Sequence, residues 1–117
     1  MEQVESTATT LTEQTARYLS RMDSIWPMYP AIERVVLFGS RAKGVNRPNS
    51  DMDLIFYESG LTRREWMLLD NAIDDLYLPI TVDLLRAGDV RHPGLLEHIA
   101  RVGITIYERT LPKETDL

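Results

Sequence analysis

Three aspartates in the middle of the chain are the residues whose types and spacing could do chemistry. Asp51 and Asp53 stand on either side of Met52, and Asp83 follows further along. If the first two lie on a strand, their side chains leave the same face with Cα atoms roughly 7 Å apart. Two ionised carboxylates at that spacing repel each other unless a cation or a shared proton neutralises them. The pair therefore indicates a metal site.

The composition narrows the choice of metal. The stretch around these aspartates contains no histidine, and the chain contains no cysteine. Oxygen ligands alone favour Mg²⁺ or Mn²⁺, usually completed by water and by substrate phosphates. The absence of cysteine also excludes disulfide scaffolds, thiolate metal sites and cysteine nucleophiles.

A turn that could bind phosphate precedes the aspartates. Gly39 and Ser40 follow the short apolar run Val35–Phe38, where exposed backbone N–H groups and a hydroxyl could contact phosphate oxygens. Arg41 and Lys43 in the same turn could neutralise the remaining phosphate charge. We expect this turn to bind phosphate, with Ser40 as a candidate helix N-cap.

The elements that must position these residues can be read from the hydrophobic pattern. In Asp51–Tyr57, one face is wholly apolar and the other begins with the two carboxylates. The run Ile80–Leu85 also alternates, and Asp83 lies on its less apolar face. If the two strands are neighbours, the three acids converge, and such a triad can hold two metal ions roughly 4 Å apart for phosphoryl transfer.

The remaining elements follow from periodicity and from helix start and stop signals. A capping box at Thr62–Glu65 opens a helix whose apolar stripe ends at Pro79. The other predicted elements are a helix from Thr9 to Trp26, a strand at Val35–Phe38, a short helix at Pro93–Val102 ending at Gly103, and a last strand at Ile104–Tyr107.

Together these elements predict one α/β (α+β) domain over residues 1–117, a mixed sheet of about four strands flanked by helices, with its core motifs at residues 35–85. The formal net charge of −5 argues against a duplex nucleic-acid surface, although it leaves room for a bound nucleotide. The first residues lack an apolar core, so we expect neither a secretion signal nor a membrane segment, and a cytoplasmic location.

The motifs resemble a known signature. Gly39-Ser40, ten intervening residues and then Asp51-Met52-Asp53 are similar to the signature of the DNA-polymerase-β-like nucleotidyltransferase superfamily. The strings LFGSRAKG and SDMDL, with the short chain, most resemble the minimal nucleotidyltransferase (MNT) antitoxins of HEPN–MNT toxin–antitoxin pairs. The likeness covers about Val35 to Leu85.

This resemblance implies a polymerase-β-like fold, triphosphate binding by Gly39 and Ser40, and metal binding by Asp51, Asp53 and Asp83. It also implies transfer of a nucleoside monophosphate, usually AMP from ATP, to a hydroxyl on a partner toxin of the HEPN type, in a hetero-oligomer. Larger members use a helical domain to hold their second substrate. Its absence here leads us to expect that a partner supplies acceptor recognition.

Two other functions stay open. The chain could be an antitoxin that neutralises its toxin by docking, without catalysis. It could also modify a small molecule or RNA together with a separate subunit, although an aromatic and basic RNA surface is lacking.

Several residues have simpler interpretations. Paired aspartates can mark a solvated strand end, and Asp83 can be an edge-strand acid or an ion-pair partner. Arg41, Lys43 and Arg47 can be ordinary surface charges. We assign no role to His92 and His98, and we expect the larger aromatic residues to pack the core unless an exposed subset docks a partner; these are Tyr18, Trp26, Trp66 and Tyr77.

Overall fold

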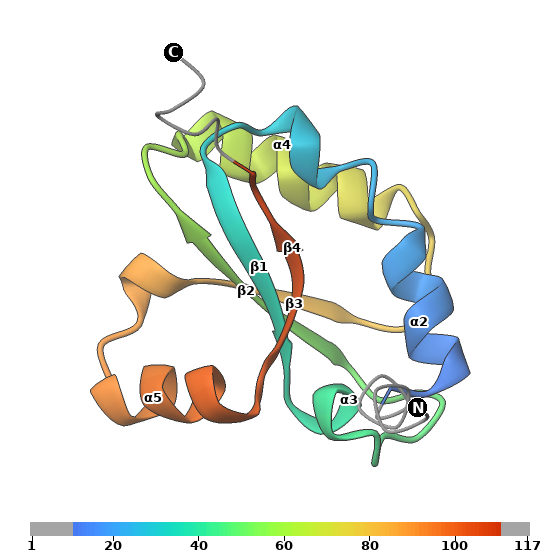
Figure 1. The fold of residues 1–117 in the computed structure, drawn as a ribbon. Coiled ribbons are helices and arrows are strands. Elements are labelled where there is room, and N and C mark those ends of the chain that lie inside the picture. The colour runs from blue at the N-terminus through green and yellow to red at the C-terminus, as the bar shows by residue number, and fades with distance from the viewer. Residues whose placement is uncertain (1–10, 111–117) are drawn as a thin grey trace.

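A single mixed sheet forms the centre of the computed structural model, which describes residues 11–110. Within that range the sheet has four strands in the order β3-β2-β1-β4 (Figure 1). Their bounds are β1 Ile32–Phe38, β2 Met52–Glu58, β3 Val82–Arg86 and β4 Ile104–Glu108. β1 runs antiparallel to β2 and β4, whereas β2 and β3 are parallel. The predicted mixed sheet is confirmed.

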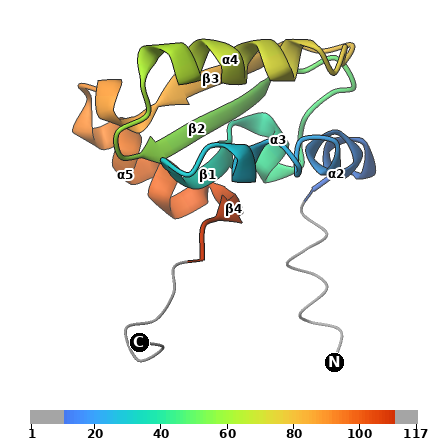
Figure 2. The same ribbon diagram turned by 90° about the horizontal axis from the view of Figure 1, so that it is seen from above.

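Helices pack against both faces of this sheet. The buried side chains of α2 (Glu13–Ser20), the 3₁₀ turn η1 (Trp26–Met28) and α4 (Arg63–Asp74) join the cluster on one face. α5 (Pro93–Val102) packs on the other face, and Figure 2 shows α4 and α5 on different sides of the sheet. Two short elements, α3 (Ser40–Lys43) and η2 (Ala87–Asp89), follow β1 and β3.

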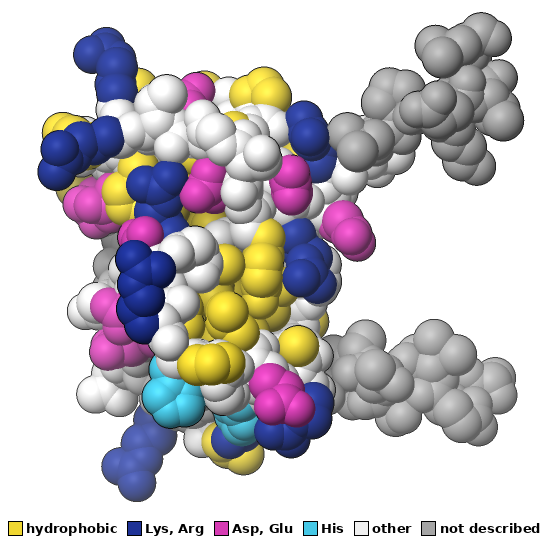
Figure 3. Space-filling model, turned by 90° about the vertical axis from the view of Figure 1, so that its left-hand side faces the viewer, with side chains coloured by type: hydrophobic (Ala, Val, Ile, Leu, Met, Phe, Trp, Pro, Cys, Tyr) yellow, Lys and Arg dark blue, Asp and Glu magenta, His cyan; other side chains and the backbone are white. Residues whose placement is uncertain are grey.

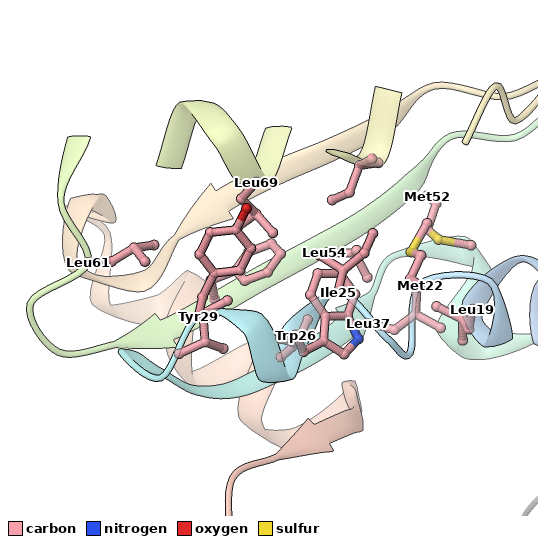
Figure 4. Close-up of a cluster of buried hydrophobic side chains, with 14 of the residues drawn as sticks. Leu19, Met22, Ile25, Trp26, Tyr29, Leu37, Met52, Leu54, Leu61 and Leu69 are labelled. Atoms are coloured by element: carbon pink, nitrogen blue, oxygen red, sulfur yellow. The ribbon is translucent and has the colours of Figure 1, made fainter. Parts of the chain in front are cut away.

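The larger core lies between the sheet and α2, η1 and α4 (Figure 4). Met52, Leu54 and Phe56 are fully buried there, so the apolar face predicted for β2 is confirmed. Phe56 contacts Trp26 and Trp66 edge to face, with ring centroids 5.4 Å and 5.5 Å apart. This geometry suits the electrostatics of aromatic rings.

A smaller core lies beneath α5. Val36, Ile55 and Ile99 are buried there. Partly buried hydrophobic residues surround them: Phe38, Tyr57, Leu85, Ala87, Val90, Leu95 and Leu96. Figure 3 shows hydrophobic side chains on this flank, bordered by histidine and by charged side chains. The face of β2 that carries Asp53 is therefore the face that α5 partly covers.

The first helix is shorter than predicted. It covers Glu13–Ser20, and positions 9 and 10 lie outside the described residues. Turns follow, in which Met22 N–H donates to Leu19 O and Ile25 N–H donates to Met22 O, both at 2.9 Å. Because such turns advance at nearly helical spacing, they continue the apolar periodicity without continuing the helix.

Other boundaries moved by a few residues. β1 begins at Ile32, before the predicted start, because the polar Glu33 and Arg34 interrupt the apolar run while the strand continues across a register shift between Ile32 and Arg34. α4 has the predicted capping box at Thr62 and Glu65 but ends at Asp74, well before Pro79. α5 has the predicted bounds, with Gly103 as its C-cap.

The aromatic residues behave as expected with one exception. Trp26 is buried, and Tyr18 and Trp66 are partly buried against the main core. Tyr77 is 84% exposed, so its assignment to the core was wrong. Tyr77 lies in the turn after α4 and has a positive φ of 53°. Because the helix has already ended at Asp74, Tyr77 does not extend the apolar stripe of α4. No helix within residues 11–110 is long and apolar enough to cross a membrane.

Candidate active site at the strand ends

Three strand ends meet at one edge of the sheet. The last residue of β1, Phe38, pairs with Asp53 near the start of β2. Asp53 in turn pairs with Asp83 near the start of β3, because β2 and β3 are parallel and in register. Asp53 therefore lies between the end of β1 and Asp83, as required for the predicted convergence.

Asp53 and Asp83 form a close carboxyl pair on the sheet face that α5 partly covers. Paired residues of neighbouring strands point to the same face, so both side chains emerge together. Burial raises the pKa of Asp53, and the negative charges of Asp83 and Asp51 and a side-chain hydrogen bond with Asp83 raise it further. A bound cation would relieve this repulsion, so the pair has the chemistry of a metal-binding group.

Asp51 is less tightly held. It lies just before β2 and not within it, and its charge raises the pKa of Asp53 less than the charge of Asp83 does. Asp51 and Asp83 are both exposed, whereas Asp53 is partly buried. Among residues 11–110, no three His, Cys, Asp or Glu side chains gather closely enough to enclose a metal ion. The structure thus brings Asp53 and Asp83 together and leaves Asp51 at the rim.

Gly39 lies directly against this pair. Its φ of 78° and ψ of −160° fall in a region that is essentially restricted to glycine. A Cβ atom at this position would overlap the Oδ2 atom of Asp53. Glycine is therefore required twice, once by the backbone and once by the approach of the carboxylate.

The turn after Gly39 is short and well bonded. Ala42 N–H and Lys43 N–H both donate to Gly39 O, at 3.1 Å and 3.4 Å. Gly39, and not Ser40, takes the N-cap position, because its unusual φ and ψ make the turn out of the strand. Ser40 is the first helical residue, and Lys43 is exposed in the last turn of α3.

Arg41 is placed differently from the expectation that it neutralises phosphate charge. Its side chain is fully buried and donates hydrogen bonds to side chains of α2 and to carbonyl groups of the loop before β2. These contacts commit the guanidinium to the protein, so its phosphate-binding role is withdrawn. Nothing in the sequence signalled that Arg41 is buried, since its hydrogen-bond partner Thr15 lies 26 positions away.

The other charged and histidine residues considered in the sequence take no part in the Asp53–Asp83 pair. Arg47 is an exposed loop residue. His92 caps α5, where its Nδ1 accepts from Leu95 N–H at 3.3 Å, and His98 is exposed. Both histidines, to which the sequence assigned no role, thus have simple positions, one as a helix cap and one on the exposed surface.

The match to a family model decides the family. The model described as polymerase beta, nucleotidyltransferase matches residues 21–111, which include Gly39, Ser40 and all three aspartates. The chain belongs to the polymerase beta nucleotidyltransferase family. Family membership agrees with the resemblance seen in the motifs and with the strand-end location of the acids.

Solved structures share the fold of this nucleotidyltransferase domain. A toxin–antitoxin crystal structure with AMP-PNP has 18% identity and a TM-score of 0.56, over 88% of this chain and 74% of that one. A complex of tri-AMPylated Shewanella oneidensis HEPN toxin with MNT antitoxin has 15% identity and a TM-score of 0.59, over 82% of this chain and 73% of that one.

A third structure, a nucleotidyltransferase candidate from Sulfolobus solfataricus, has 18% identity and a TM-score of 0.51, over 86% of this chain and 93% of that one. No curated protein has a significant match to the nucleotidyltransferase domain. At these identities the structural neighbours establish the fold, and the family model establishes the superfamily.

Proposed function

We propose that this chain is a divalent-metal-dependent nucleotidyltransferase that transfers AMP from ATP to a hydroxyl of a partner toxin, and so acts as an antitoxin. The observation that carries the proposal is the Asp53–Asp83 pair, in register on parallel strands with Gly39 against it. A carboxyl pair beside a glycine turn, in which burial and neighbouring negative charge raise the pKa of Asp53, suits a metal and a triphosphate better than it suits stability.

In this proposal, Asp51, Asp53 and Asp83 hold Mg²⁺, or Mn²⁺ in its place. Asp53 and Asp83 are already adjacent, and the exposed Asp51 completes the set from the rim. When bound, the metal supplies positive charge that neutralises the triphosphate and favours ionisation of the attacking hydroxyl. The fit rests on the donor chemistry, since all three ligands are carboxylates.

Ser40 and Lys43 are the proposed triphosphate contacts beside Gly39. Ser40 begins α3 with its hydroxyl next to the glycine, and the exposed Lys43 carries the ammonium group nearest to it in sequence. In the transfer, the acceptor oxygen forms a bond to the α-phosphorus, the bond to the β-phosphate breaks, and pyrophosphate leaves. The chain's residues position and neutralise these groups.

The partner is proposed from the structural neighbours. One of them contains a tri-AMPylated HEPN toxin bound to an MNT antitoxin, and another is a toxin–antitoxin structure with AMP-PNP. By analogy we propose a HEPN-type toxin as both acceptor and binding partner of this chain, in a hetero-oligomer. This step is an analogy of fold.

The test is adenylyl transfer to a purified HEPN-type toxin, followed by intact-mass measurement of the toxin. With ATP and Mg²⁺, we expect the wild type to add adenylate and the Asp51→Ala, Asp53→Ala double variant to add none. Addition by the double variant would refute the assignment of the acids. Adenylate found only on added RNA or on a small molecule would redirect the acceptor assignment.

One observation favours a second function. The three aspartates are not gathered into a closed ligand set within residues 11–110, as a docking antitoxin with a regulatory nucleotide pocket would allow. If the double variant still neutralises the toxin in cells after losing transfer, docking is the function that protects the cell. If neutralisation and transfer are lost together while binding to the toxin persists, the catalytic proposal stands.

A further inference from the structure

A buried arginine links the turn after β1 to the loop that carries the first aspartate. Arg41 is one of two buried polar or charged residues in the described part of the chain, and its guanidinium is fully enclosed. Burying a charge is costly unless it is hydrogen-bonded on several sides. Such a group is expected to have a specific role in holding the structure.

The guanidinium makes contacts in two directions. Toward α2, Nη1 donates to Thr15 Oγ1 at 2.8 Å and to Gln14 Oε1 at 3.1 Å. The Arg41 guanidinium also lies 5.7 Å from the centroid of the Tyr18 ring, within the range of a cation–π contact. This side anchors the arginine to the first helix.

Toward the loop, the same group holds two carbonyl oxygens. Nε and Nη2 donate to Ser50 O at 3.1 Å and 2.9 Å, and Nη2 also donates to Pro48 O at 3.2 Å. The two-pronged contact with Ser50 O requires the planar fork of arginine, which lysine cannot reproduce. The carbonyl of Ser50 belongs to the peptide unit that begins Asp51.

We infer that Arg41 is a positioning residue for Asp51. It fixes the peptide unit in front of Asp51 relative to the Gly39-Ser40 turn, and thereby sets where the exposed carboxylate meets the metal and triphosphate. The inference rests on the proposed nucleotidyltransferase function. It explains how Asp51, a proposed metal ligand that lies outside the strands, is held in place. Arg41 fixes the peptide unit before Asp51, and the hydrogen bond from Met52 N–H to Thr81 O, at 2.9 Å, fixes the residue after it.

The test compares Arg41→Lys with Arg86→Lys. Arg86 offers a matched control because it also donates to a carbonyl, Leu61 O at 2.9 Å, and to a side chain, Glu58, at the opposite end of β3. Both substitutions keep the positive charge and remove the forked guanidinium group, so both are expected to lower stability. Only Arg41→Lys is expected to weaken binding of ATP with Mg²⁺, by about 10- to 100-fold, as loss of an outer partner of a ligand does.

A second measurement separates positioning from other roles. Amide hydrogen exchange of Ser50 and Met52, which flank Asp51 and donate to Arg47 O and Thr81 O, is expected to speed up in Arg41→Lys and to stay unchanged in Arg86→Lys. Faster exchange with unchanged ATP affinity would make Arg41 purely structural. Weaker ATP binding with unchanged exchange would mean a direct phosphate contact. Either result overturns the inference.

Failure of the proposed function would look different. If the wild-type protein binds no ATP in the presence of Mg²⁺, the nucleotide site itself is wrong, and the positioning role falls with it. If the wild type binds and the two lysine variants lose affinity equally, the nucleotide site stands and the assignment to Arg41 falls. Thermal unfolding of each variant, measured first, selects a temperature at which all three proteins are folded.

Discussion

Gly39 and Asp53 constrain each other at the end of β1. The glycine has a backbone conformation that other residues avoid, and the space where its Cβ would lie is taken by the Asp53 carboxylate. Glycine adopts this conformation readily, whereas any other residue here would be strained. At this scale the site consists of one carboxylate that its acidic neighbours repel and that only a glycine at position 39 can accommodate.

Replacing Gly39 by alanine should affect both stability and ligand binding. We expect a loss of about 1–3 kcal/mol in the free energy of unfolding from backbone strain, and weaker binding of ATP with Mg²⁺ because Asp53 must move. Denaturant unfolding and calorimetry measure the two effects.

Gly60→Ala is the matched control, because Gly60 has a φ of 84° and no surrounding atom lies within 4 Å of the place where its Cβ would be. It should lose only the stability that its backbone conformation costs, and it should keep nucleotide affinity. Equal loss of affinity in both variants would contradict the contact between Gly39 and Asp53.

Asp53→Asn should stabilise the protein in the absence of metal. The pKa of Asp53 is raised above 3.8, chiefly by burial, so the folded state binds this proton more tightly than the unfolded state. The stability that the protein loses by ionising Asp53 is therefore zero below about pH 4, and this loss grows as the pH rises through the pKa of the folded state. Near neutral pH we expect a gain of at most about 1 kcal/mol, because solvent screens a partly exposed carboxyl.

Thermal unfolding from acid to neutral pH, in chelator, measures this difference. The advantage of Asp53→Asn should vanish at the acid end and should reverse when Mg²⁺ and ATP are added, since only the wild type can bind them fully. A variant that is less stable than the wild type near neutral pH without metal would contradict the repulsion between Asp53 and its neighbours.

At the scale of elements, the junction between α5 and β4 determines how closely the second helix layer approaches β1. Gly103 ends α5 with an ordinary φ of −74°. A Cβ there would lie 2.5 Å from Val36 Cγ1 and 2.6 Å from Ile99 O. The small residue lets β4 pair with β1 directly beneath the helix end.

Gly103→Ala should therefore destabilise the protein by overpacking alone, by about 1–3 kcal/mol. Denaturant unfolding measures the loss. The control is Gly88→Ala in η2, where nothing lies within 4 Å of the added atom, and it should be close to neutral. A neutral Gly103→Ala would show that the helix end can move away from Val36 at little cost.

The sequence was most informative about single elements. The capping box at Thr62 and the bounds of α5 could be predicted because their signals are local. The faces of β2 could be predicted because side chains alternate along a strand. The end of the first helix could not, since hydrogen-bonded turns after Ser20 maintain the same spacing of buried residues.

At the scale of the whole molecule, the contacts that build the site are non-local. Nothing in the pattern of either strand fixed the register that sets Asp53 opposite Asp83. That register depends on the packing of α4, which connects β2 to β3 along the chain. The burial of Arg41 was equally hidden, since its partners in α2 are distant in sequence. The types and spacing of the acids indicated the chemistry, and tertiary packing supplied the geometry.

The whole fold leaves the acid pair at one end of the sheet, where we propose that the donor nucleotide binds. α2, η1 and α4 bury one face, α5 covers part of the other, and the acid pair lies on that second face at the strand ends. Partly buried hydrophobic side chains beneath α5 lie on the same face of the sheet. This division is compatible with a donor site built by the chain and an acceptor presented by a partner.

Calorimetric titration of ATP into the purified chain, with and without Mg²⁺, tests the central claim most directly. The wild type should bind ATP only with Mg²⁺, and the Asp51→Ala, Asp53→Ala variant should lose that binding while remaining folded by circular dichroism. Binding that is equal in both proteins, or absent from the wild type in the presence of Mg²⁺, would contradict a metal-dependent nucleotide site at Asp51, Asp53 and Asp83.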